Sequence, residues 1–169
     1  MNRRKLGSTG LEVSEIGFGA WQLCNSDSWG GMDEPTALRL VDEAIDGGIN
    51  LFDTAPNYAD TKSEHILGRA LQNKRDKVIL VSKFGHMPEG PKDFSVDWFW
   101  KSLEASLGRL RTDYLDVLLL HNPPSEIYAG TDPVWAALEE ARVQGKIGHY
   151  GASLDFAVEV EECLANTNS

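Results

Sequence analysis

The sequence predicts an α/β protein of the (β/α)-barrel type, present as about five strand–helix units behind an N-terminal hairpin. We expect one domain over residues 1–169. Apolar strand-like runs alternate strictly with amphipathic helical segments, which indicates a parallel sheet with right-handed crossovers. The unit recurs about every thirty residues without sequence repetition, which is typical of a βαβ series. Polar residues close several successive strands, as they do where barrels build sites.

The first elements follow from apolar patterning and turn residues. A hairpin turns at Ser8–Gly10, and a first buried strand is expected around Ile16–Ala20. The helix after it begins near Pro35, which suits a first turn, and Gly47 with the next glycine ends it. The run INLFDTA then predicts the second strand of the sheet.

The remaining units repeat the same order. They comprise a helix over about Ser63–Gln72, a strand KVILVSK, a long connection FGHMPEGPKDFS, a helix with Phe99, Leu103, Leu107 and Leu110 on its inner face, a strand YLDVLLLH, a helix over Pro133–Val143, a strand KIGHYGAS and a last helix over about Asp155–Leu164. Such a series fits either a barrel or a doubly wound open sheet. No G-x-G-x-x-G follows the first strand, and the glycines of IGFGAW lie within the strand itself, so we favour the barrel.

Composition excludes several classes of protein. A formal net charge of -10 argues against a nucleic-acid partner, because phosphate binding needs clustered Lys and Arg. No apolar run approaches the length of a membrane span, and MNRRKLGSTG lacks the apolar core of a secretory signal. Cys24 and Cys163 lie far apart and form no CxxC pair, which favours reduced thiols. We therefore expect a cytoplasmic protein without membrane or nucleic-acid partners.

Four polar residues at strand ends form the candidate catalytic site: Asp53, Tyr58, Lys83 and His121. A free tyrosine has a pKa of about 10, too high for efficient proton transfer near neutrality. A neighbouring ammonium such as that of Lys83 would stabilise the phenolate form, and Asp53 could pair with that ammonium. His121 could share a hydrogen bond with the phenol or with a substrate oxygen. Together they predict a general acid for a developing alkoxide.

Each residue taken alone has an ordinary structural interpretation. Asp53 could cap a turn, Tyr58 could be a rim aromatic and His121 a half-buried histidine. A metal-dependent lyase or isomerase is a further alternative, with Asp53 and His121 as ligands. Lys83 between them would repel the cation, so we expect no metal. His65 and Glu64 are interpreted as surface or solvated helix groups, and His86 on the long connection is given no role.

The motifs together resemble the aldo-keto reductases. They are RKLGSTGLEVSEIGFGAW, FDTAPNY, LVSK, the segment from Ser106 to His121, and GKIGHYGAS, in order along essentially the whole chain. The resemblance implies a (β/α)8 TIM-type barrel closed below by a hairpin. It implies reduction of a small carbonyl substrate, an aldehyde or ketone, with NADP(H), NAD(H) being possible. It makes Tyr58 the proton donor, tuned by Lys83 and Asp53, while His121 orients the carbonyl.

The resemblance also implies cofactor and substrate contacts. Trp21 and Trp29 line the substrate pocket with His121, and Trp21, Asp53 and Ser153 contact the cofactor. Ser153 matches the first residue of a Ser-Asn pair that holds the nicotinamide carboxamide in many relatives. Leu154 replaces the Asn here, which weakens that contact.

The chain matches only the first part of the expected barrel. In relatives the sixth strand begins where this chain ends, and the later strands supply most of the residues that bind the cofactor. We therefore expect a truncated form with impaired reductase activity, the alternative being a non-enzymatic binding or assembly form. A partial barrel exposes two sheet edges, so we expect self-association or a partner that covers them.

Overall fold

The computed structural model describes residues 1–24 and 30–167. Its main sheet is parallel and consists of β3 (Phe18–Gly19), β4 (Leu51–Asp53), β5 (Ile79–Phe84), β6 (Leu115–His121) and β7 (Ile147–Ser153). The strands are hydrogen-bonded in their order along the chain, β3-β4-β5-β6-β7. A (β/α) barrel has this sequential order. In a doubly wound sheet, by contrast, the spatial order of the strands reverses at one point in the sheet. The α/β fold is therefore a partial barrel.

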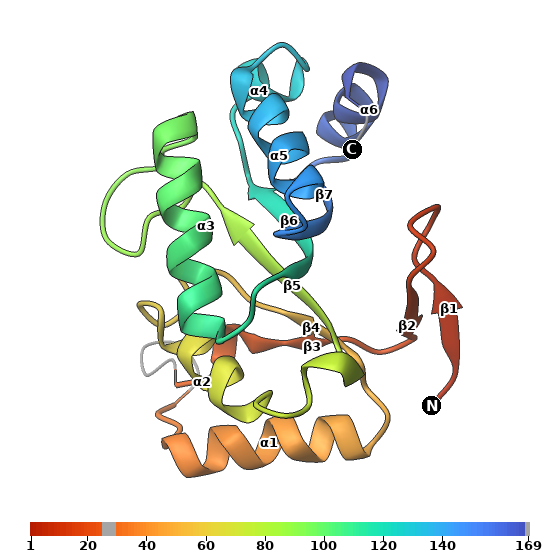
Figure 1. Ribbon diagram of the computed structural model, residues 1–169, viewed down its shortest axis with the longest axis vertical. Helices are drawn as coiled ribbons and strands as arrows, with labels where there is room; N and C mark the ends of the chain where they lie inside the picture. Colours follow the sequence, from red (N-terminus) through yellow and green to blue (C-terminus); the bar gives the residue numbers. More distant parts are fainter. Residues whose placement is uncertain (25–29, 168–169) are drawn as a thin grey trace.

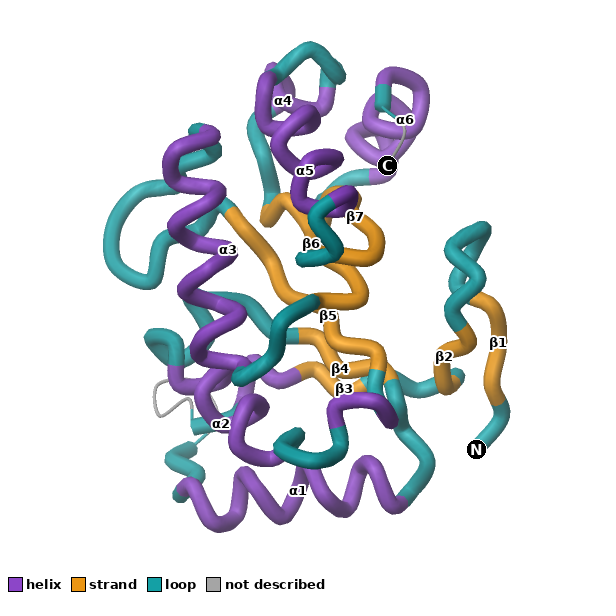
Figure 2. The backbone as a smooth tube through the Cα atoms, in the orientation of Figure 1, coloured by secondary structure: helices purple, strands orange, loops and turns teal. Residues whose placement is uncertain are grey.

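Helices connect the strands and lie along one side of the sheet (Figures 1 and 2). They are α1 (Glu34–Asp46), α2 (Lys62–Ala70), α3 (Val96–Leu110), α4 (Ser125–Tyr128), α5 (Pro133–Val143) and α6 (Ala157–Asn166), with short 3-10 turns η1 (Ala20–Gln22) and η2 (Arg75–Lys77). Asp33, Ser95 and Asp132 cap the first turns of α1, α3 and α5 through their side chains. None of the helices in the described residues is long and apolar enough to cross a membrane.

The apolar face predicted for α3 is confirmed. Phe99, Leu103, Leu107 and Leu110 are all buried in one core with residues of the neighbouring helices and strands. Their spacing places them on one side of the helix, where burial of large apolar side chains is the main stabilising contribution.

Three local expectations differ from the structure. The first sheet strand is only two residues long, and Ile16 is 59% exposed instead of buried. Its partner strand β4 has three residues, so the parallel ladder joins only Phe18 to Phe52 and Gly19 to Asp53. The short helix α4 was not predicted, since four residues are too few to show helical periodicity. The last helix begins at Ala157, two residues later than expected.

The N-terminal hairpin is tied to the sheet through two buried side chains, those of Asn50 and Ser14. Strands β1 (Arg3–Lys5) and β2 (Glu12–Ser14) pair antiparallel, as the turn residues predict. Asn50, immediately before β4, accepts from the Ser14 backbone N–H at 2.7 Å and donates to the Glu12 carbonyl at 2.9 Å. These bonds place the hairpin at the end of the sheet where the strands begin.

Glu64 corrects the sequence interpretation. It was expected to be a solvated helix charge, but it is completely buried between α2 and α3. Its carboxylate accepts from Arg109 at 2.6 Å and from Ser82 at 2.7 Å. Gly68 permits the close approach, because a Cβ there would lie 2.2 Å from the Arg109 carbonyl oxygen. A buried charge needs such partners, and the helical periodicity around Glu64 did not reveal them.

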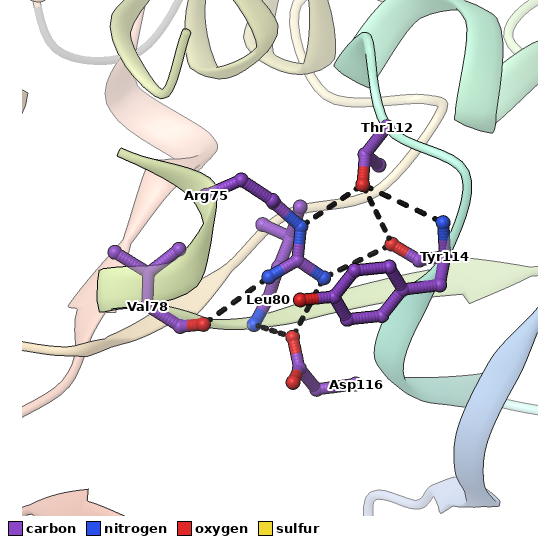
Figure 3. A network of polar contacts seen from close by, with 6 residues as sticks. All are labelled: Arg75, Val78, Leu80, Thr112, Tyr114 and Asp116. Atoms are coloured by element: carbon purple, nitrogen blue, oxygen red, sulfur yellow. Dashed lines mark hydrogen bonds and ion pairs between the residues drawn. The ribbon is translucent and has the colours of Figure 1, made fainter. Parts of the chain in front are cut away.

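A second polar network joins the beginnings of β5 and β6 (Figure 3). The Arg75 guanidinium donates to the carbonyl oxygens of Val78 at 3.1 Å and Tyr114 at 2.9 Å, to Thr112 Oγ1 at 3.1 Å and to Asp116 Oδ2 at 2.7 Å. The Asp116 carboxylate also accepts from the Leu80 N–H at 2.8 Å. This network lies at the opposite end of the strands from the candidate site, so it contributes stability to the sheet and not chemistry.

Candidate active site

The four predicted residues meet at the carboxyl ends of adjacent strands. Asp53 is the last residue of β4, Lys83 lies in β5 one residue before its end, and His121 ends β6. Tyr58 follows β4 in a tight turn, where its N–H donates to the Ala55 carbonyl at 3.1 Å. Because parallel neighbours end at the same edge, the register brings these side chains together.

Lys83 is the centre of the cluster. Its Nζ lies 2.6 Å from Asp53 Oδ1, 2.9 Å from the Thr54 carbonyl oxygen and 3.2 Å from the Tyr58 hydroxyl oxygen. The residue is only 5% exposed, so its charge is removed from bulk water. An ammonium has three protons to donate, and these three acceptors use all of them. The expected pairing of Asp53 with Lys83 is therefore present.

His121 lies beside the tyrosine without a hydrogen bond to it in the described residues. The Tyr58 and His121 rings meet edge to face, with centroids 6.0 Å apart and planes at 84°. Burial lowers the pKa of His121 from 6.5 to about 3, and the nearby charges of His86, Lys83 and Lys92 act in the same direction. The imidazole is therefore neutral near physiological pH.

The hydrogen bonding of His121 selects its tautomer. Nδ1 is buried and has no hydrogen-bond partner. An orphaned buried N–H is rarer in proteins than an orphaned acceptor, so the single proton of the neutral ring belongs on Nε2. A neutral imidazole with its proton on Nε2 donates one hydrogen bond from that atom, which suits it to hold a carbonyl oxygen.

The structure places two of the three residues predicted to contact cofactor or substrate beyond the four catalytic residues. Ser153 ends β7 and pairs with His121 in the parallel ladder, so it lies on the same rim. Trp21 lies in η1, directly after β3, and is 40% exposed. Because Gly19 pairs with Asp53, Trp21 follows the rim on the opposite side from Ser153. Trp29 lies outside the described residues.

These residues fit the nicotinamide end of a dinucleotide. The Asp53 side chain is 40% exposed, Ser153 pairs with His121 in the ladder, and Trp21 is an aromatic residue that is 40% exposed. Such a mixture of a few polar groups with an aromatic surface is typical of cofactor sites. In the described residues, no group of three or more His, Cys, Asp or Glu side chains could hold a metal ion.

A cavity borders the rim beyond β6. It has a volume of about 380 Å3 and is lined by Lys92, Phe94, Asn122, Pro123, Pro124, Asp155 and Glu159. One of its lining residues, Asn122, follows His121 directly in the chain. A larger cavity of about 780 Å3 lies between the hairpin, α5, β7 and α6 and includes none of the four predicted residues. Neither cavity is lined by any of the four predicted residues, and the smaller one includes Asn122, which follows His121 in the chain.

Sequence reasoning missed the contact between His86 and His121. Their ring centroids lie 4.4 Å apart with planes at 33°. His86 belongs to the connection after β5, where no periodicity predicts the backbone path. The available signal was that His86 follows Lys83 by three residues on the same rim.

The assembled groups have the features of a proton-transfer site. A phenol has a buried ammonium at hydrogen-bond distance, a carboxylate holds the ammonium, and a neutral imidazole packs beside the phenol. The ammonium lies where negative charge would develop on the phenol oxygen if the phenol gave up its proton. The arrangement can therefore protonate an oxygen that develops negative charge.

Comparisons with known proteins agree with this architecture. The model of the Aldo/keto reductase family matches residues 15–168. The chain is 37% identical over 176 residues to the uncharacterized oxidoreductase YqkF of Bacillus subtilis, covering 99% of this chain and 54% of the relative. It is 41% identical over 163 residues to L-galactose dehydrogenase of Arabidopsis thaliana, covering 90% and 49%.

A solved structure is equally similar. The holo form of aldo-keto reductase AKR11C1 from Bacillus halodurans superposes with a TM-score of 0.86 at 35% identity, covering 99% of this chain and 55% of that one. The chain thus spans about half the length of the curated relatives it matches. The similarity runs from the hairpin to α6 and includes β4, β5, β6 and the turn after β4, which together carry the four site residues. With that fold and that coverage, the chain belongs to the aldo-keto reductase family.

Proposed function

We propose that the chain carries the proton-donating site of a cytoplasmic oxidoreductase that reduces aldehydes or ketones to alcohols with a nicotinamide cofactor. NADP(H) is the first choice and NAD(H) the second. The observation that supports the proposal most is that Lys83 Nζ contacts both Asp53, at 2.6 Å, and the Tyr58 hydroxyl, at 3.2 Å. Carbonyl reduction needs a proton donor for the developing alkoxide, and this contact prepares Tyr58 for that role.

Each residue has one step in the proposed mechanism. His121 donates from Nε2 to the carbonyl oxygen and holds it beside the phenol. Tyr58 gives its proton to that oxygen as negative charge develops there. The Lys83 ammonium stabilises the phenolate that remains, because opposite charges within hydrogen-bond distance attract strongly where water is excluded. Asp53 fixes the ammonium and balances the cost of burying it.

The cofactor supplies the hydride that reaches the carbonyl carbon. Ser153 and Asp53 are the polar groups proposed to hold its nicotinamide end, with Trp21 packing against it. Leu154 follows Ser153 and has no amide to add. We therefore expect weaker retention of the carboxamide than a Ser-Asn pair would give.

The substrate proposal begins with sugars. Among the relatives, one is named L-galactose dehydrogenase and another, 35% identical over 159 residues, 6-dehydroglucose reductase of Novosphingobium aromaticivorans. A sugar carries hydroxyl groups beside its carbonyl. Asp155 and Glu159 in the cavity beside His121 could accept hydrogen bonds from such hydroxyls.

The test is NADPH oxidation by the purified 169-residue chain with a panel of sugar aldehydes, simple aldehydes and ketones. Tyr58→Phe is expected to lower kcat by roughly a hundredfold or more, since the general acid is lost. Tyr114→Phe is the matched control, because Tyr114 packs over Arg75 at the far end of the strands. Equal rates for Tyr58→Phe and the unchanged chain would contradict the role of Tyr58.

A binding or assembly role without catalysis is the second candidate. It is favoured by the short share of its relatives' length that the chain spans. Titration of tryptophan fluorescence with NADPH separates the two candidates. Saturable quenching supports the reductase, whereas a monodisperse chain that binds neither NADPH nor NADH supports the second candidate.

A further inference from the structure

His86 and His121 form a stacked imidazole pair at the rim. Their centroids lie 4.4 Å apart with planes at 33°, so the rings are in contact and tilted against each other. Nε2 of His86 and Nδ1 of His121 are both buried without a hydrogen-bond partner. Two stacked rings that both carried charge would repel each other in this partly buried position. The contact therefore disfavours a state in which both rings are charged at once.

The backbone after β5 is built to bring His86 over His121. Gly85 has φ 116°, a left-handed conformation that favours glycine. A Cβ at Gly85 would lie 2.1 Å from the Phe94 ring, so a larger residue would also displace that side chain. The Asp93 N–H donates to the Gly85 carbonyl at 2.8 Å and closes the connection into a small loop.

Lys92 fastens this loop to β6. His86 and Lys92 form an isolated antiparallel bridge, which places Lys92 opposite His86 in the loop. Lys92 Nζ donates to the carbonyl oxygen of Asn122 at 2.9 Å. The Asn122 N–H in turn donates to the Ser153 carbonyl at 2.9 Å. The loop is therefore attached to the residue directly after His121, and movement of the loop moves His86 relative to that ring.

We propose that His86 is a positioning residue that packs against the His121 ring and fixes its orientation and its neutral form for contact with the carbonyl oxygen. The inference rests on the proposed function for the meaning of that contact. His86 acts through His121, because its own Nε2 is buried and unavailable to a substrate.

Three positively charged or titratable groups around His121 oppose its protonation: Lys83 from β5, and Lys92 and His86 from the loop. The Tyr58 ring packs against it from the turn after β4, and the Asp53 carboxylate pairs with Lys83. Burial and the charge of Lys92 also lower the pKa of His86 itself. Removal of the His86 ring opens His121 to water on one face, and burial is the largest cause of its lowered pKa.

The experiment follows the His121 imidazole by proton–nitrogen NMR in the 169-residue chain between about pH 7.5 and about pH 4.5, a range in which an unperturbed histidine titrates. The unchanged chain is expected to keep His121 neutral throughout, with the proton on Nε2. In His86→Ala the pKa of His121 is expected to rise from about 3 toward 6.5, so that it titrates within the range. His86→Phe restores a stacked ring and is expected to keep His121 neutral.

Two further variants keep the inference falsifiable. Lys92→Met removes both the attachment to Asn122 and a charge that opposes protonation of His121, and the two changes are expected to move the His121 resonances in the same direction as His86→Ala, by a smaller amount. His65→Ala is the matched control, because His65 is on the exposed side of α2. Unchanged His121 resonances in folded His86→Ala would overturn the proposal. If His86→Ala does not fold, unchanged resonances in Lys92→Met overturn it.

The outcomes separate this inference from the proposed function. The NMR titration needs neither cofactor nor turnover, so it tests the role of His86 even if the chain reduces no carbonyl. If the chain is active, His86→Ala is expected to lower kcat roughly tenfold, because the hydrogen bond from His121 to the carbonyl oxygen would be weakened. His86→Phe is expected to restore most of the lost kcat. An active chain in which His86→Ala leaves both kcat and the titration unchanged supports the function and refutes the positioning role.

Discussion

Lys83 and Asp53 form a short ion pair in which only one partner is buried. Nζ and Oδ1 lie 2.6 Å apart, while the lysine side chain is 6% exposed and the aspartate side chain 40%. The buried ammonium depends on this carboxylate, because an unpaired charge away from water is costly. The carboxylate itself remains open to the rim. The pair therefore links the stability of the sheet to the candidate chemistry.

Asp53→Asn is expected to weaken both properties. The amide keeps the shape but loses the charge, so the free energy of unfolding should fall by about 1–3 kcal/mol, measured by urea denaturation. The kcat of Asp53→Asn should be roughly 10-fold to 100-fold lower than that of the unchanged chain, because the Lys83 ammonium loses its charged partner. Asp42→Asn is the control. The Lys74–Asp42 pair has the same 2.6 Å separation, but its lysine and aspartate side chains are 35% and 48% exposed. Equal stability losses in the two variants would refute the dependence of buried Lys83 on Asp53.

The pH dependence of stability should carry a contribution from His121. Its pKa is lowered in the folded chain to about 3 from 6.5, so the unfolded chain binds more protons between these values. The contribution is therefore fully present above pH 6.5 and is lost progressively as the pH falls toward 3. We expect the stability difference between the unchanged chain and His121→Gln to shift in favour of the variant as the pH falls. Urea denaturation at several pH values measures it, with His65→Gln as the control, and a pH-independent difference would be the contrary result.

Glu64 should be among the most sensitive positions outside the site. Glu64→Gln removes the charge that faces Arg109 in a position with no solvent exposure. Loss of one partner of a buried pair costs about 3 kcal/mol or more of unfolding free energy, measurable by urea denaturation. Glu104→Gln breaks the exposed pair with Lys146 and should cost less than about 1 kcal/mol. A loss at Glu64 no greater than that at Glu104 would show that the buried pair contributes little.

The 169-residue chain should self-associate through the β7 side. Among the described strands, β3 and β7 are the two edges of the main sheet. Phe156, Val158, Val160 and Leu164, after β7 and on α6, are each more than 40% exposed. Open edges with apolar surface nearby favour association with a second copy. We expect light scattering after gel filtration to give a mass above that of the monomer at about micromolar concentration, where such surfaces associate.

Charge on α6 provides the control for that association. Val160→Lys with Leu164→Lys should shift the chain toward the monomer, because burying two ammonium groups in a contact is unfavourable. Val143→Lys changes a more exposed apolar residue at the end of α5 and should leave the mass unchanged. A monomeric unchanged chain would remove the basis for the prediction.

Residues near each other in sequence allowed most elements to be predicted. The bounds of α5 follow from Pro133 at its start and the apolar spacing after it, and they agree with the structure. The inner face of α3 follows from helical periodicity in the same way. The four site residues could be predicted because Asp53, Lys83 and His121 lie at the ends of apolar strands, with Tyr58 just beyond the first of these, and parallel strands end at one edge.

Contacts between distant segments decided the remainder. Glu64 has an ordinary helical context, and only the approach of α3, 45 residues later, makes it a buried ion-pair partner. His86 lies on a connection without periodicity, and only the bridge to Lys92 and the attachment to Asn122 place it on His121. Sequence alone determined the alternation of strands and helices and the residue types at the rim, since both depend on local spacing. Tertiary structure alone decided which of those groups are dehydrated, paired or neutral, because burial and charge interactions depend on what the rest of the fold brings within a few ångströms.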